Sequence, residues 1–168
     1  HSDLIFSNLS NNQFVITGGS TGEPTKFPTS KVEQINNYAN AYLGRSWFGV
    51  SPLDEILLIW GHSHLFGTGI IGQFNNIKRI IYDSLINTRR LNAYDMSIDT
   101  LNKYYLILLK SNPVLIIGYT SVIYKLAKFI KENNLIIGDK SNLKGIVVTS
   151  ETVTKLDVDL IEEIFQVQ

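Results

Sequence analysis

Glu-Ile-Leu-Leu-Ile-Trp, residues 55–60, is an apolar run that is too short to form a typical helix. Its length and composition predict a strand buried on both faces, which is typical of a parallel sheet. The chain leaves this strand through Gly61, His62 and His64. Because ligands of parallel α/β sheets bind at the carboxyl ends of the strands, these residues are candidates for a functional site.

Downstream of this run, helical and extended patterns alternate from Ser97 onward. Ser97 is a favourable N-cap for a helix, and Pro113 closes that helix before the next apolar run. The patterns predict helices over 98–108, 122–130 and 156–164, and strands over 114–117 and 145–149. This alternation indicates the α/β class, with a mostly parallel sheet flanked by helices and right-handed crossovers.

Upstream of the run, Phe14 to Thr17 predicts a short strand that enters a glycine-rich loop. Ser30 and Glu33 form the S-x-x-E pattern of a capping box, and a helical apolar pattern follows until Gly44. The strand ends where ligand-binding residues are expected are Thr17, Trp60, Ile117 and Thr149.

The composition fits one ordinary domain over residues 1–168 and excludes several functional classes. With 15 basic and 15 acidic side chains, the net charge of zero gives no overall attraction to nucleic acid or to an anionic membrane. The absence of cysteine excludes thiol nucleophiles and thiolate zinc sites. Polar residues interrupt each apolar stretch before about 20 residues, so we expect no membrane span. Without a signal-peptide pattern, a cytoplasmic protein is the default expectation.

The loop at residues 17–26 reads TGGSTGEPTK and holds three glycines, four hydroxyl side chains and a lysine. Glycine lets main-chain N–H groups approach phosphate oxygens, while hydroxyls and lysine add donors and charge. The spacing is neither that of a Walker A loop nor G-x-G-x-x-G. Gly18, Ser20 and Gly22 match a serine-hydrolase elbow, but Pro24 and Pro28 prevent the helix that must follow it. A polyphosphate loop and a plain mobile turn are the two interpretations that the residues allow.

The string T-G-G-S-T-G-E-P resembles the phosphate loop T-S-G-S-T-G-x-P of the adenylate-forming superfamily. The Pro-Thr variant looks more like the phenylacetate-CoA ligase branch and its CapK-like relatives in capsular polysaccharide biosynthesis. Residues 110–126, with Gly118-Tyr119-Thr120-Ser121, are similar to the segment K-P..I.GYPS....LA of that branch. Residues 143–165 look like its strand, G-x-E-P turn and helix. Since the later family motifs are missing, we expect a fragment of the large N-terminal domain, without the C-terminal lid domain.

The resemblance implies the ATP-binding core of a ligase that activates a small carboxylate as an acyl-adenylate, with CoA as an acyl acceptor. It implies that ATP or AMP is held through phosphate contacts from Thr17, Gly18, Gly19, Ser20, Thr21, Gly22 and Lys26. It also implies contacts to the nucleotide base from Ser150 and Glu151, and a substrate pocket at His64 and Tyr119. The Glu that holds Mg²⁺ is expected outside this chain, and no catalytic residue is assigned within it. The alternative is a non-catalytic nucleotide-binding module or a structural domain.

Other candidate residues carry weaker signals. His62 and His64 form an incomplete metal-ligand set, because no carboxylate or cysteine lies nearby in the sequence. His64 starts an H-x-x-G element that is similar to one beside the acyl pocket of the family. His62 is interpreted as a structural histidine. Arg89 and Arg90 could grip a carboxylate or phosphate, but a solvated turn is the favoured interpretation. The remaining tyrosines of the second half are expected to pack in the core, namely Tyr94, Tyr104, Tyr105 and Tyr124.

Overall fold

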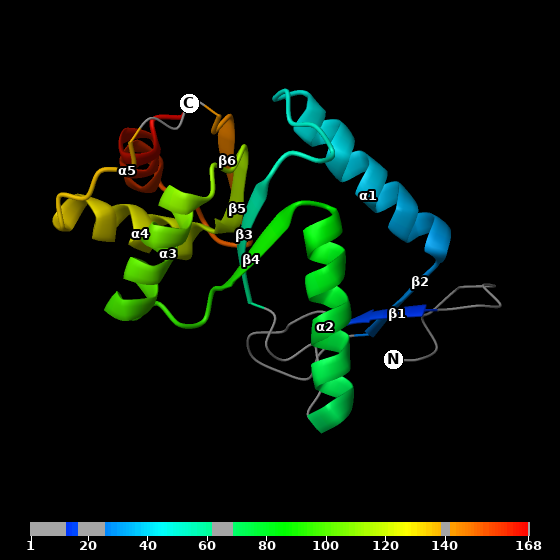
Figure 1. Ribbon diagram of the computed structural model, residues 1–168. Coiled ribbons are helices and arrows are strands. Elements are labelled where there is room, and N and C mark those ends of the chain that lie inside the picture. The colour runs from blue at the N-terminus through cyan, green and yellow to red at the C-terminus, as the bar shows by residue number, and fades with distance from the viewer. Residues whose placement is uncertain (1–12, 17–25, 62–68, 139–141, 168) are drawn as a thin grey trace. The chain divides into compact units, whose positions relative to one another are not determined.

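The computed structural model describes residues 13–16, 26–61, 69–138 and 142–167 (Figure 1). The chain divides into two compact units, His1–Trp47 and Phe48–Gln168. The expectation of one domain over the whole chain stays a prediction, and the two units are described one after the other.

The first unit contains a strand pair and a helix. Strand β1 (Gln13–Ile16) pairs antiparallel with β2 (Lys26–Thr29). Helix α1 (Lys31–Ser46) begins with the predicted capping box. The Ser30 Oγ accepts from the Glu33 N–H at 3.1 Å, and the Ser30 N–H donates to the Glu33 carboxylate at 2.7 Å. These two bonds satisfy main-chain donors at both residues, which explains why the helix starts here.

Two predictions in this unit are wrong. The strand predicted at 14–17 exists as β1, but it lies in a two-stranded antiparallel sheet and not in the parallel sheet. Its partner β2 carries Pro28, a residue that strands tolerate only at an edge. Helix α1 also continues past Gly44 to Ser46. Gly44 therefore lies inside the helix and does not end it. A Cβ at Gly44 would meet no atom within 4 Å.

The second unit contains a four-stranded, fully parallel sheet in the order β4-β3-β5-β6. The strands are β3 (Ile56–Trp60), β4 (Thr88–Asn92), β5 (Leu115–Tyr119) and β6 (Gly145–Thr149). The apolar run at residues 55–60 contains the central strand β3, in which Ile56, Leu57 and Ile59 are buried. Burial of neighbouring residues on alternate faces confirms a strand covered on both sides.

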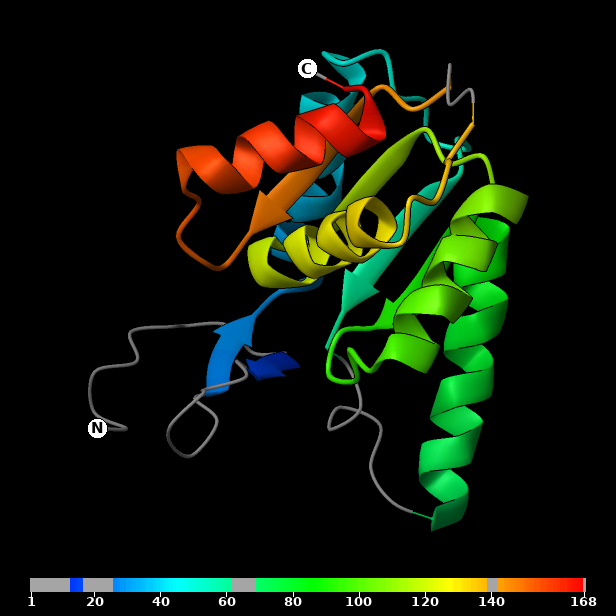
Figure 2. The same cartoon turned by 90° about the vertical axis from the view of Figure 1, so that its left-hand side faces the viewer.

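Three helices cover one face of this sheet, as Figure 2 shows. They are α3 (Ile98–Lys110), α4 (Thr120–Glu132) and α5 (Lys155–Phe165), and each follows the pattern predicted for it. Leu108, Ile123 and Leu126 are fully buried in the main core. A smaller cluster of Val50, Ile56 and Leu115 lies apart from it. The α/β class with a mostly parallel sheet flanked by helices is therefore confirmed.

Helix α2 (Gly69–Leu85) and strand β4 were not predicted, and the turn favoured at Arg89 and Arg90 is wrong. Both arginines are strand residues, paired with Leu57 and Leu58 of β3. Strand β4 can carry charged side chains because it lies at an edge of the described sheet, where they are tolerated. Only Leu91 of this strand is buried in the core.

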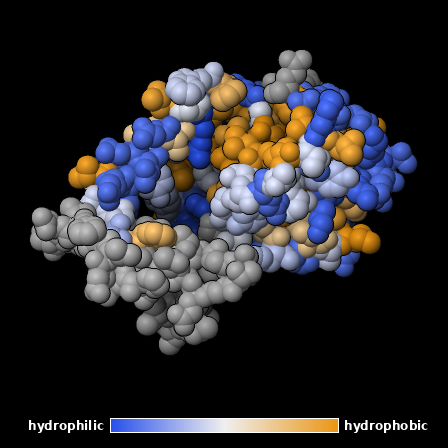
Figure 3. Space-filling view, turned by 180° about the vertical axis from the view of Figure 1, so that it is seen from behind, coloured by the Kyte–Doolittle hydropathy of each residue, from blue (hydrophilic) through white to orange (hydrophobic). Residues whose placement is uncertain are grey.

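Several large apolar side chains are exposed on α1 and α2. Helix α1 buries no residue, and Val32 and Ile35 of its expected apolar face are 66% and 65% exposed. The exposed apolar residues of α2 are Ile77, Ile80, Ile81, Tyr82 and Leu85. Figure 3 shows hydrophobic residues gathered in a patch on the face seen from behind. Among the described residues, no helix is both long enough and apolar enough to cross a membrane.

Candidate functional site

The carboxyl ends of β3, β5 and β6 lie side by side at one edge of the parallel sheet, which we name the carboxyl edge. The register pairs Ile59 with Gly118 and Tyr119 with Thr149. Tyr119 and the turn at Ser150 therefore leave neighbouring strands at the same edge. The sequence placed both near the carboxyl ends of strands, and the topology brings these ends together.

An aromatic cluster of Trp60, Tyr94 and Tyr119 lies at the carboxyl edge. The rings of Trp60 and Tyr119 are stacked, with centroids 4.6 Å apart and planes 29° from parallel. Tyr94 lies across Gly61, because a Cβ built there would be 2.5 Å from the Tyr94 Cζ and 2.7 Å from its hydroxyl oxygen. Tyr94 is 57% exposed, so its predicted place in the core is wrong. The cluster places one indole and two phenol groups at the carboxyl edge.

The surroundings of the Tyr119 hydroxyl favour its neutral form. Burial raises the pKa of Tyr119, and the neighbouring Tyr94 acts in the same direction. A hydrogen bond with the main chain of Gly61 lowers the pKa, while the charge of Glu151 raises it. The group therefore remains an uncharged hydrogen-bonding phenol at neutral pH.

The turn after β6 is fastened to the start of helix α4. One Glu151 carboxylate oxygen accepts from the Ser121 main-chain N–H at 2.6 Å, and the other accepts from the Ser121 hydroxyl at 2.9 Å. The N-cap residue Tyr119 makes no side-chain cap bond. Glu151 thus caps α4 from a loop 30 residues away, a partnership that local capping patterns do not reveal.

The turn itself has an unusual main-chain conformation. Ser150 has a φ of +66°, in the left-handed region that favours glycine. The hydroxyl of Ser150 lies 3.5 Å from that of Thr149.

Gly118, the fourth residue of β5, also has little free space around it. A Cβ at this position would lie 3.1 Å from both the Ile123 Cδ1 and the main-chain oxygen of Ile59. The glycine therefore lets α4 pack closely on β5 directly below the carboxyl edge.

Most residues predicted to bind the phosphates lie outside the described residues. They are Thr17, Gly18, Gly19, Ser20, Thr21 and Gly22, and the same holds for His62 and His64. Lys26 is described as the first residue of β2, opposite Ile16 at the end of β1. The segment 17–25 therefore connects the two paired strands. The roles of these residues stay predictions.

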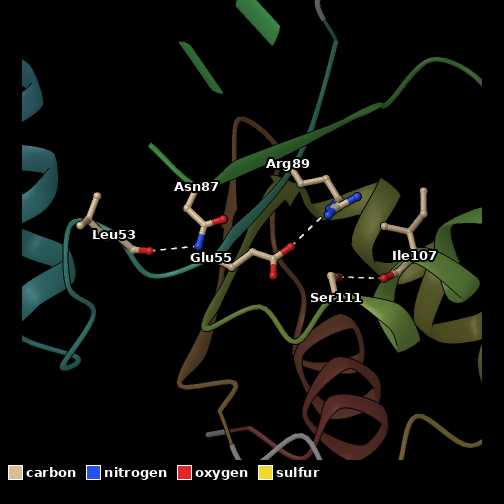
Figure 4. Close-up of polar contacts among 6 residues, drawn as sticks. All are labelled: Leu53, Glu55, Asn87, Arg89, Ile107 and Ser111. Atoms are coloured by element: carbon tan, nitrogen blue, oxygen red, sulfur yellow. Dashed lines mark hydrogen bonds and ion pairs between the residues drawn. The ribbon is translucent and has the colours of Figure 1, made fainter. Parts of the chain in front are cut away.

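At the opposite, amino edge of the sheet, Arg89 and Arg90 bind carboxylates of the protein itself. Figure 4 shows the pair of Arg89 with Glu55. The Arg90 Nε lies 2.6 Å from the Asp83 Oδ2, and the Arg89 Nε lies 3.3 Å from the Glu55 Oε1. These residues, with Arg79 of α2, line a cavity of about 480 Å³. Burial lowers the pKa of Arg79, and repulsion from Arg90 adds to this effect. The arginine pair is best explained as part of a structural ion-pair network.

Within the described part of the chain, no group of three or more His, Asp or Glu residues could hold a metal ion.

The fold and the sequence were compared with known proteins. No family model matches the chain. Over 151 residues it is 27% identical to the protein CapK of Staphylococcus aureus, covering 89% of this chain and 32% of CapK. The fold is similar to an open conformation of 2-hydroxyisobutyryl-CoA ligase in complex with 2-HIB-AMP and CoA. That match has a TM-score of 0.59 and 21% identity over 92% of this chain and 32% of the ligase.

The thioesterification-state structure of the same ligase gives the same TM-score of 0.59, with 21% identity over 93% of this chain and 31% of that chain. The resemblance to the adenylate-forming enzymes is confirmed. The chain spans about a third of the length of CapK and of the ligase.

Proposed function

We propose that this chain is the nucleotide-binding core of an adenylate-forming ligase. The observation that carries the proposal is the ligase-like fold over 92% of the chain, in a sequence with the TGGSTGEP loop at 17–24. The similarity to CapK supports the CapK-like branch and a role in capsular polysaccharide biosynthesis. The place of action is proposed to be the cytoplasm.

In the proposed reaction, a carboxylate oxygen of the substrate attacks the α-phosphorus of ATP. The bond between the α-phosphorus and the bridging oxygen to the β-phosphorus breaks, so the products are an acyl-adenylate and pyrophosphate. A thiol such as that of CoA then attacks the acyl carbon, and AMP leaves. The chain contributes by placing reactants and by stabilising phosphate charge.

The phosphate contacts are assigned to the glycine-rich loop. Main-chain N–H groups of residues 18–22 and the hydroxyls of Thr17, Ser20 and Thr21 donate to the β- and γ-phosphates, and Lys26 adds positive charge. The nucleotide base is assigned to the turn at Ser150 and Glu151. The Mg²⁺ that accompanies ATP is assigned to a Glu outside this chain.

The acyl group is assigned to the carboxyl edge near Tyr119, with His64 following Gly61 in the chain. Tyr119 stacks on Trp60, and burial keeps its hydroxyl neutral. A neutral phenol at the margin of an apolar surface can donate to a carboxylate while the rings contact its apolar part.

ATP–pyrophosphate exchange in the complete protein tests this proposal. We expect exchange that depends on an added small carboxylate. The double variant Ser20→Ala/Thr21→Ala should reduce exchange by about tenfold or more, because it removes hydroxyl donors that stabilise phosphate charge. Ser84→Ala at the amino edge is the matched control and should leave exchange unchanged. If the double variant kept both exchange and ATP affinity, the assignment of the loop would be wrong.

The second candidate function is a nucleotide-binding module without chemistry of its own. This candidate is favoured because the chain spans only about a third of the length of CapK and of the ligase. It predicts binding of ATP without pyrophosphate exchange.

A further inference from the structure

Glu151 makes contacts that its proposed role at the nucleotide base does not explain. Both of its carboxylate oxygens are bonded to Ser121, at 2.6 Å and 2.9 Å. We propose that Glu151 is a positioning residue, which fixes the turn after β6 against helix α4 so that the main chain of this turn receives the adenine. This inference rests on the proposed function and names the part that one side chain plays in it.

The charge of the carboxylate suits the place that it occupies. Ser121 is the second residue of α4, so its N–H belongs to the first turn, where helices leave donors unsatisfied and favour negative charge. Tyr119 cannot supply this cap from its own side chain. Glu151 therefore stabilises the start of α4, and the same two bonds hold Glu151 in one orientation.

The neighbouring residue shows why the turn needs such a contact. Ser150 has a φ of +66°, a region that is unfavourable for a residue with a Cβ. Two charge-assisted hydrogen bonds at the next residue offset this cost. Because Ser150 is left-handed, the main-chain N–H and C=O groups of this turn point in other directions than they would with an extended residue.

The contact also joins two parts of the proposed site. Ser121 follows Tyr119 by two residues, and Tyr119 pairs with Thr149 in the sheet. A change at Glu151 is therefore transmitted to the turn on one side and to the start of α4, next to Tyr119, on the other. Glu151 couples the proposed base-binding turn to the proposed acyl surface.

Binding of ATP and of inorganic tripolyphosphate to the complete protein, measured by calorimetry, separates positioning from direct contact. Tripolyphosphate has no base, so its affinity reports the glycine-rich loop alone. We expect Glu151→Ala to weaken ATP binding about tenfold, the loss of roughly 1.4 kcal/mol, and to leave tripolyphosphate binding unchanged. Glu151→Gln can accept from the Ser121 N–H through its amide oxygen and donate to the Ser121 hydroxyl through its amide nitrogen, so it should restore most of the affinity for ATP.

Ser121→Ala provides the second variant, because it removes the hydroxyl bond and keeps the main-chain bond. It should weaken ATP binding less than Glu151→Ala, and adding it to Glu151→Ala should cause no further loss. Glu163→Ala is the matched control: its carboxylate bonds Lys131 at 2.6 Å, at the other end of α4. This control should bind ATP as the unchanged protein does.

Two results would overturn the inference. Unchanged ATP affinity in Glu151→Ala would show that the turn does not depend on the contact. Losses in Glu151→Ala and Ser121→Ala that simply add would show that Glu151 acts on the nucleotide independently of Ser121. If the unchanged protein bound neither ATP nor tripolyphosphate, the proposed function would fail instead, which is a different outcome from either of these.

Discussion

The two edges of the parallel sheet differ in what their carboxylates bind. At the amino edge, Asp83 and Glu55 bind arginines, and the Ser111 hydroxyl donates to the Ile107 carbonyl at 2.7 Å. At the carboxyl edge, the Glu151 carboxylate binds the start of helix α4, and the buried Thr120 hydroxyl has no hydrogen-bond partner among the described residues. Left-handed non-glycine residues lie at both edges, Asn87 at the amino edge and Ser150 at the carboxyl edge.

This difference separates an edge that is held by ion pairs between side chains from an edge that is held by one carboxylate at a helix start. The amino edge, with its ion pairs, is predicted to dominate the response to mutation, and four measurements test this comparison.

The largest expected effect is at the amino edge. Asp83→Ala removes the buried partner of Arg90 and leaves that guanidinium near Arg79, so the free energy of unfolding should fall by about 3 kcal/mol. Urea denaturation measures this change. Glu55→Ala is the control, because its partner Arg89 is 53% exposed and the loss should be below about 1 kcal/mol. Equal losses in the two variants would refute the distinction between a buried and an exposed pair.

Glycine substitutions should have the next largest effect, at the carboxyl edge. Gly118→Ala places a Cβ 3.1 Å from the main-chain oxygen of Ile59, which cannot move freely, and should destabilise the protein by about 2 kcal/mol. Gly61→Ala meets only the far end of the exposed Tyr94 ring, which can turn away at a smaller cost. Thermal unfolding of both variants gives the order, and a greater loss in Gly61→Ala would contradict the packing described.

The two buried hydroxyls sharpen the comparison further, with effects of opposite sign. Thr120→Val keeps the shape and removes a hydroxyl without a described partner, so it should stabilise the protein by about 1 kcal/mol. Ser111→Ala removes a made hydrogen bond and should destabilise it by about 1 kcal/mol. Chemical denaturation of the pair measures both signs. Destabilisation by Thr120→Val would mean that this hydroxyl has a partner.

The smallest expected effect is at alkaline pH. Because the pKa of Tyr119 is raised in the folded state, the free energy of unfolding should decrease as pH rises from about 10 through the folded pKa. Tyr119→Phe should make this decrease shallower. Stability curves on both sides of pH 10 check the sign, and a decrease of equal slope in the variant would show that Tyr119 does not contribute.

Much of the fold could be predicted from the sequence because its local signals agree. Continuous apolar runs predicted the strands β3, β5 and β6. Ser30, Ser97 and the patterns that follow them predicted where two helices begin. The carboxyl edge was located by the same reasoning, since parallel strands align their ends.

The parts of the fold that the sequence did not predict depend on contacts between residues that lie far apart in the chain. Strand β4 reads Thr-Arg-Arg-Leu-Asn, and its charges are acceptable only because Asp83 and Glu55 lie beside an edge strand. The cap of α4 by Glu151 joins residues 30 positions apart, so no local motif marks it. The left-handed main chain at Ser150 was not predicted either, because serine adopts this region far less readily than glycine.

The most direct test of the central claim is thermal unfolding of the protein in the presence of increasing ATP. Binding to the native state must raise the melting temperature, with a stabilisation of about 2.7 kcal/mol at one hundred times the dissociation constant. We predict such a rise, and its loss in Ser20→Ala/Thr21→Ala. A melting temperature that is independent of ATP concentration would contradict the account of this chain as a nucleotide-binding core.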